Sequence, residues 1–191
     1  MCSAFGAALI LAVIVIVALG AGERGTVAAL RASARFSFLL FWIAYAGRAL
    51  TALFGPPFQP LKQRAREFGL AFAAAHLVHI GLVGWLCWIG AAPAAGVFVF
   101  FGVAVIFTYL LALQSIGNLQ QLLGPRWWWL LRTIGINYIA YAFFVDFVND
   151  PLNGSIKHLV LYFPFATLAV VGPFLRLAAW TLQTKDRWLK S

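Results

Sequence analysis

The sequence predicts an all-α, polytopic integral membrane protein with six transmembrane helices. Of its 191 residues, 63% are apolar and only 10% are charged, and the mean hydropathy is +0.91. Soluble domains are closer to half apolar and a quarter charged, so the composition excludes an ordinary soluble globule, a disordered chain and a disulfide scaffold. The apolar residues also gather into six long runs, each near the ~20 residues that a helix needs to cross about 30 Å of hydrocarbon.

Glycine and proline separate the six runs in chain order. The first run ends in a Gly-Ala-Gly sequence at 20–22, the second is followed by Gly-Pro-Pro at 55–57, and Pro93 lies between the third and the fourth. A Gly-Pro pair at 124–125 precedes the fifth run, and an Asp-Pro pair at 150–151 follows it. The predicted spans, which together make residues 1–191 a single transmembrane domain, are residues 4–22, 36–54, 68–89, 94–114, 127–148 and 159–182.

The first span is predicted to be a retained helix rather than a cleaved signal peptide. No Lys or Arg precedes its apolar run, and the run is long for the core of a signal peptide. No segment is left for a soluble domain, and the chain has no glycine-rich phosphate loop, Gly-x-Ser-x-Gly or His-Glu-x-x-His motif. We therefore expect any chemistry to take place within the membrane or on a partner.

Basic residues indicate how the helices are oriented. The formal net charge is +9, from fourteen Lys and Arg against five Asp and Glu, and the basic residues lie in short gaps between apolar runs. This distribution favours contact with anionic membrane lipid and does not suggest nucleic acid as a partner. With six spans both termini share a side, which collects ten basic residues against four on the other side, namely Arg24, Arg31, Arg35 and Lys157. By the positive-inside rule we expect both termini in the cytoplasm, with the chain in a bacterial inner membrane.

Two histidines in the third run are the main candidates for a functional site, because polar groups at membrane depth are costly and mark functional positions by default. His76 and His79 share one helical face and lie about 12 and 17 Å beyond Phe68, which brackets the bilayer midplane. A neutral imidazole there can ligate haem iron or another metal, relay a proton, or bond to a neighbouring helix. The pair supplies only two of the usual four metal ligands, while the small residues at 73–75 leave room for a flat cofactor or a close helix.

Two arginines within the spans form a second candidate group. Arg48 in the second run and Arg132 in the fifth lie near the expected cytoplasmic ends of their helices. Each can extend to lipid phosphate, or the two can face the anionic edge of a cofactor, such as haem propionates. On the outer side we expect a solvated loop with local ion pairs, formed by Asp146, Asp150, Lys157 and His158.

Several short motifs occur in a characteristic order. A Gly-x-Ala-Leu stretch at 47–50 precedes a proline loop and a basic loop, and Arg-Glu-Phe-Gly-Leu at 66–70 then leads into the third helix with its histidines. The fifth run opens at 123–132 with a sequence similar to Gly-x-x-Trp-x-x-Leu-His-Arg. This order resembles the ferric reductase-like transmembrane domain, a superfamily that includes NADPH oxidases, metalloreductases and the membrane haem subunit of a bacterial methionine sulfoxide repair system. The similarity covers about five of the six spans.

The resemblance implies a haem b held between the third and fifth helices by paired histidines, with electrons passing through the membrane from a flavin partner. By its distance from the Gly-Leu pair at 69–70, His79 matches the third-helix ligand best, and His76 is the alternative. Leu131 occupies the place of the fifth-helix histidine, and the second such position, near residues 144–145, is also apolar. What remains is a five-coordinate haem on one histidine, a tyrosine ligand, a ligand from another subunit, or no haem.

The first functional hypothesis is a membrane haem-binding or electron-transfer subunit, an oxidoreductase component without its own flavin or nicotinamide domain. His79 and His76 would bind the haem iron, and Arg48 and Arg132 would face the propionates. A flavoprotein or a quinol would be the electron donor. The alternative is a degenerate, haem-free accessory or scaffold subunit of a larger membrane complex, in which the histidines bond helices together. A transporter or proton channel is a third hypothesis, although the sequence places no acidic residue near the midplane to continue a polar path.

Overall fold

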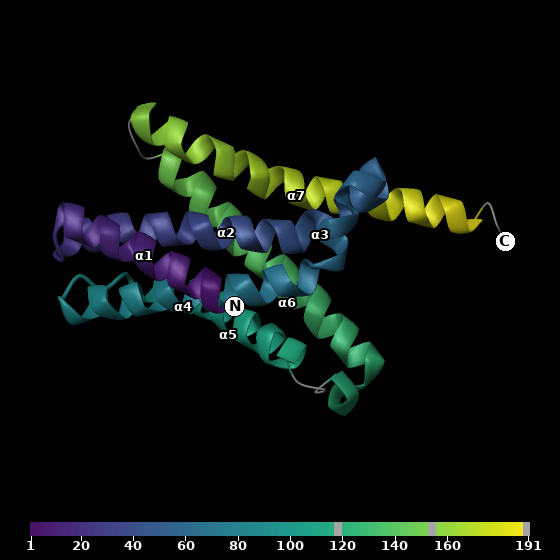
Figure 1. The fold of residues 1–191 in the computed structure, drawn as a ribbon, viewed down its shortest axis with the longest axis horizontal. Coiled ribbons are helices and arrows are strands. Elements are labelled where there is room, and N and C mark those ends of the chain that lie inside the picture. Colours follow the sequence, from purple (N-terminus) through teal and green to yellow (C-terminus); the bar gives the residue numbers. More distant parts are fainter. Residues whose placement is uncertain (117–119, 153–155, 189–191) are drawn as a thin grey trace.

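A computed structural model (Figure 1) describes the backbone of residues 1–116, 120–152 and 156–188, and the side chains of residues 1–116, 124–148 and 161–184. No strand occurs in these described residues, and six helices are long and apolar enough to cross a membrane. The predicted all-α, polytopic membrane fold is therefore confirmed. The elements are α1 (Cys2–Leu19), α2 (Glu23–Phe54), a 3-10 turn η1 (Pro56–Phe58), α3 (Gln59–Gln63), α4 (Ala65–Trp88), α5 (Ala95–Ile116), α6 (Gln120–Leu152) and α7 (Ile156–Trp188).

The bundle is built around α2, because α1, α4 and α7 all pack against it. α1 also packs on α4, and α6 packs against both α5 and α7. In Figure 1, α2 follows the long axis of the molecule while α6 crosses it obliquely. We call the end of the bundle with the α1–α2 turn the Gly20 end, and the end with the connection from α2 to α4 the α3 end. The N-terminal end of α1 and the C-terminal end of α7 both point toward the α3 end (Figure 1).

Glycines with positive φ mark the breaks between helices. Gly20, with φ of 90°, ends α1, and Gly55, with φ of 81°, ends α2. Within α6, Gly124 has a φ of 71°, and Pro125 follows it at the start of the membrane-spanning part, Gly124–Val148. Residues with side chains rarely adopt such angles, while proline suits the first turn of a helix. These breaks coincide with those predicted from the sequence.

α2 begins at Glu23, whereas the predicted second span begins at residue 36. The gap that contains Arg24, Arg31 and Arg35 is therefore helix rather than loop. At a rise of about 1.5 Å per residue, Arg31 lies about 12 Å and Arg35 about 18 Å beyond Glu23. Both arginines consequently lie within the bundle, and both are half-buried.

Small side chains at helical spacing explain this longer helix. Gly25, Ala29 and Ser33 are buried along one face of α2, and α1 buries only alanines, at every fourth position from Ala4 to Ala12. Small residues at this spacing allow two transmembrane helices to approach closely. A hydropathy pattern does not reveal such a helix, because the arginines at intervening positions lower its mean hydropathy.

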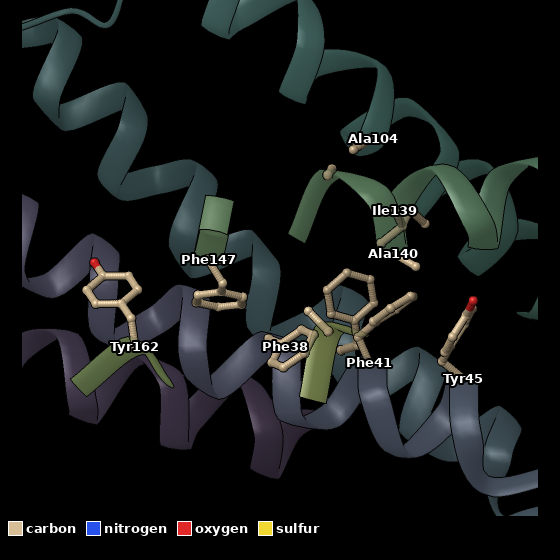
Figure 2. Close-up of a cluster of buried hydrophobic side chains, with 11 residues drawn as sticks. Phe38, Phe41, Tyr45, Ala104, Ile139, Ala140, Phe147 and Tyr162 are labelled. Carbon is tan, nitrogen blue, oxygen red and sulfur yellow. The ribbon is translucent and has the colours of Figure 1, made fainter. Parts of the chain in front are cut away.

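The main core is a cluster of aromatic rings that joins α2, α4, α6 and α7 (Figure 2). Phe38 and Phe147 are each 1% exposed, and their ring centroids lie 4.8 Å apart in an edge-to-face arrangement. Phe143 lies 5.1 Å from Phe38 and 6.0 Å from Phe72 of α4. Such pairs stabilise a fold by about 0.5–1.5 kcal/mol beyond the burial of their area. The cluster fixes α6 against α2 and fills part of the space between α4 and α6.

Candidate functional site

His76 and His79 stack on one face of α4, with their ring centroids 5.3 Å apart and their planes at 16°. Both side chains are half-buried. Ser33 of α2 is hydrogen-bonded to His79, and the Tyr109 ring of α5 lies 6.4 Å from the His76 ring. The Tyr109 hydroxyl donates to the carbonyl of Ala73 at 3.2 Å. The histidine pair therefore lies where α4 meets both α2 and α5.

One hydrogen bond fixes which nitrogen of His79 carries a proton. Ser33 Oγ lies 3.0 Å from His79 Nδ1 and also 3.0 Å from the carbonyl oxygen of Leu30. Ser33 donates its single hydroxyl proton to the Leu30 carbonyl, so the His79 tautomer compatible with both contacts carries its proton on Nδ1 and donates it to Ser33 Oγ. Neutral His79 thus has a lone pair on Nε2. Metal-binding histidines are commonly oriented in this way, through a hydrogen bond from the nitrogen that does not bind the metal.

His76 lacks a comparable bond. Its Nδ1 is buried and has no hydrogen-bond partner among the described residues, and the nearest ring besides His79 is Phe72, at 5.5 Å. On α2, Arg35 Nε and Ser37 Oγ are likewise buried without a described partner. Unpaired buried polar atoms cost about 1–3 kcal/mol each and are uncommon in folded proteins. The described interior therefore holds several buried polar atoms that have no described hydrogen-bond partner.

A cavity of about 520 Å³ lies beside His79, and we call it the His79 cavity. Side chains of α2, α4, α5, α6 and α7 line it, and most of them are apolar. Small-molecule and cofactor sites commonly combine an apolar cavity with a few polar groups. Here the polar lining residues are Arg31, His79, Asp146 and Tyr162.

Asp146 lies in α6, where its half-buried side chain lines the His79 cavity, rather than in the solvated outer loop that the sequence suggests. The side chains of Asp150, Lys157 and His158, assigned to the same loop, lie outside the described residues. An acidic group and a histidine therefore share one cavity, which is the combination that the proton-path hypothesis needs and the sequence does not predict.

Arg35 places its guanidinium against aromatic rings next to the His79 cavity. Its Cζ lies 4.5 Å from the centroid of the Tyr162 ring and 5.6 Å from that of Phe165. A desolvated cation–π contact contributes about 2 kcal/mol. These rings from α7 therefore offset part of the cost of holding a positive charge inside the bundle.

Arg48 and Arg132 lie at the α3 end, away from the histidines. Arg48 is about 22 Å from Ser33 along α2, at 1.5 Å per residue. Both arginines are exposed, and both line a separate cavity of about 280 Å³ together with Arg176 of α7. The structure therefore brings His76 to His79 and Arg48 to Arg132, but it does not bring the two pairs together.

The space between α4 and α6 decides what kind of haem site is compatible with the fold. The centroid of the Phe143 ring lies 6.0 Å from Phe72 and 5.5 Å from Phe41, whereas elsewhere Phe41 and Phe72 line a cavity of about 430 Å³ together with residues of α5 and α6. Residues 145–147 of α6, which line the His79 cavity, include no histidine. The described residues contain no group of three or more His, Cys, Asp or Glu that could hold a metal ion. The donor set fits one axial bond from Nε2 of His79, and it does not fit a bis-histidine site.

Arg31 and Asp146 are cavity residues that the sequence does not single out. For Arg31 the available signal is the spacing of Ala29, Ser33 and Ser37, which extends the second helix upstream. For Asp146 it is the unbroken apolar run around this residue, since the next helix breaker is the proline at 151. Both signals indicate how far a helix continues along the chain.

No family model, no curated protein and no solved structure matches the chain. Its fold and site define it as an all-α, polytopic membrane protein with a stacked histidine pair inside the bundle. Its function is therefore inferred from the geometry around that pair.

Proposed function

We propose that the chain is a membrane haem-binding subunit for electron transfer, in which His79 would hold the haem iron. The observation that carries the proposal is the Ser33–His79 hydrogen bond, which leaves a lone pair on Nε2 of a histidine that lines a cavity of about 520 Å³. A neutral imidazole nitrogen of this kind is a common ligand of haem iron. When bound, haem b would supply one-electron redox chemistry at the depth of His79.

The neighbouring residues have distinct roles in this proposal. Ser33 would hold the His79 imidazole in one tautomer, and the His76 ring lies stacked beside it. Arg31 lines the same cavity and supplies positive charge for the carboxylates of the cofactor. The geometry favours Arg31 over Arg48 and Arg132 for that role, because the latter two line a cavity at the α3 end.

The proposal includes a separate electron donor. A flavoprotein or a quinol of the membrane has suitable chemistry. With both termini in the cytoplasm, the α3 end with its basic residues would face a cytoplasmic donor. The chain would then act as one component of an oxidoreductase.

The absorption spectrum of the purified protein tests the proposal. Protein expressed with an adequate haem supply should show a Soret band. His79→Ala should lose that band, whereas His76→Ala, the matched control on the same helical face, should retain it. Absence of the band from the parent protein, or an unchanged band in His79→Ala, would contradict haem ligation by His79.

A haem-free accessory or scaffold subunit is the second candidate, and two observations favour it. The Ser33–His79 bond joins α2 to α4, as a purely structural histidine would, and residues 145–147 of α6, which line the His79 cavity, include no second histidine. This candidate predicts no Soret band and co-purification with a larger membrane complex in mild detergent. Recovery of a solitary, haem-loaded protein would exclude it.

A further inference from the structure

Three arginines from three different helices line one cavity at the α3 end, which we call the arginine cavity. Arg48 comes from α2, Arg132 from α6 and Arg176 from α7, and the cavity has a volume of about 280 Å³. No Asp or Glu is among the described residues that line it. The cavity therefore gathers positive charge without a described carboxylate in its wall.

Packing around the arginine cavity holds Arg176 in place. Its Cζ lies 4.3 Å from the centroid of the Tyr45 ring, and Tyr45 is buried. The Tyr45 hydroxyl donates to Asn137 Oδ1 of α6 at 3.0 Å. Gly172 permits α7 to lie close to this ring, because a Cβ there would be 3.3 Å from Tyr45 Cδ1. Residues of α2, α6 and α7 thus form a fixed support for one of the three charges.

The three positive charges repel one another, because all three arginines line the same cavity. Such an arrangement is unfavourable until an anion enters, because like charges at short range raise the energy of the bundle. Arginine suits oxyanions in particular, since its planar guanidinium matches phosphate with two parallel hydrogen bonds. Thr133 and Gln183, which also line the cavity, can add neutral donors.

We propose that the arginine cavity binds a phosphate group, carried either by an anionic phospholipid or by a soluble phosphate compound. Trp129 and Trp180 line the same cavity and are 63% and 62% exposed. Tryptophans of this kind gather at the level of lipid headgroups. The site is independent of the proposed haem site, because it shares none of its residues with the His79 cavity.

The test measures stabilisation of the delipidated protein in a non-ionic detergent. Phosphatidylglycerol, phosphatidylcholine, inorganic phosphate and pyrophosphate are added separately, and the thermal unfolding midpoint is followed. We expect phosphatidylglycerol to raise the midpoint, with its half-maximal concentration increased about five-fold for each arginine replaced by glutamine. Arg126→Gln is the matched control, because Arg126 is an exposed arginine of α6 that is not among the residues lining the arginine cavity.

The separate additions distinguish the two sources of phosphate. An arginine-dependent effect of phosphatidylglycerol alone would indicate a lipid headgroup, and an equal effect of pyrophosphate or inorganic phosphate would indicate a soluble compound. The triple variant carries Arg48→Gln, Arg132→Gln and Arg176→Gln together. If phosphatidylglycerol and the free phosphates shift its unfolding midpoint as they shift that of the parent protein, the proposal is overturned. Arg176→Lys keeps the positive charge and is the control for a folding defect. It should retain part of the phosphate-dependent shift in the unfolding midpoint. Native mass spectrometry should also find less bound phospholipid on the triple variant than on Arg126→Gln.

Discussion

Ser33 and His79 form the polar contact on which the geometry of the site depends. The Ser33 oxygen accepts from His79 while its proton is donated to Leu30, so one serine side chain determines the tautomer of the imidazole. Altering Ser33 should therefore affect both the stability of the bundle and the orientation of His79.

Ser33→Ala should lower the free energy of unfolding by about 1 kcal/mol, because His79 Nδ1–H loses its acceptor. Thermal unfolding in mild detergent measures this loss. Ser37→Ala is the matched control, since Ser37 is equally buried on the same helix but its hydroxyl has no described partner. We expect Ser37→Ala to leave the midpoint unchanged or to raise it. Equal losses in the two variants would contradict the role given to the Ser33–His79 bond.

The tight turn between α1 and α2 depends on Gly25. A Cβ at this position would overlap the carbonyl oxygen of Gly20, which ends α1. We expect Gly25→Ala to push α1 away from α2 and to destabilise the protein by about 1–3 kcal/mol. Denaturant unfolding in detergent checks the prediction.

Gly81→Ala in α4 is the control for Gly25→Ala. No described atom lies within 4 Å of a Cβ at Gly81, so the variant should be neutral or gain about 0.5–1 kcal/mol from the better helix propensity of alanine. If Gly25→Ala and Gly81→Ala unfold at the same denaturant concentration, the close contact between Gly25 and Gly20 in the turn from α1 to α2 is contradicted.

Hydropathy and helix breakers predict six helices and most of their ends, because these features depend on local sequence. They do not predict the start of α2, since Arg31 and Arg35 mask a face of small residues that is informative only when α1 is packed against it. The stacking of His76 and His79 follows from their spacing on one helix. Their separation from Arg48 and Arg132, and the placement of Asp146 in the same cavity as His79, depend on how different helices are aligned.

The orientation of the whole molecule can be tested by cysteine labelling. In a background with Cys2→Ser and Cys87→Ser, new cysteines replace Gln63 in α3 or Ala92 beyond α4, which are both exposed. Because most of the described basic residues lie toward the α3 end, we expect a membrane-impermeant thiol reagent to label Ala92→Cys in intact cells. Gln63→Cys should react only after the membrane is opened. The reverse pattern would place the termini outside the cytoplasm.

Taken as a whole, the bundle separates its polar groups by depth. The His79 cavity lies toward the Gly20 end and combines histidine, arginine and aspartate, whereas the arginine cavity at the α3 end carries only positive charge among its described ionisable residues. The buried core (Figure 2) contributes Phe147 and Tyr162 to the lining of the His79 cavity and Tyr45 to that of the arginine cavity. This separation supports two independent sites rather than one haem site that uses all four residues predicted from the sequence.

Binding of carbon monoxide to the reduced, purified protein tests the central claim most directly. A haem held by His79 alone has an open coordination position, because α6 supplies no histidine opposite it within the described residues. The account predicts a Soret band that shifts on addition of carbon monoxide in the parent protein and in His76→Ala, and no such band in His79→Ala. A haem-free parent protein, or a haem whose spectrum does not respond to carbon monoxide, would contradict one-sided ligation by His79.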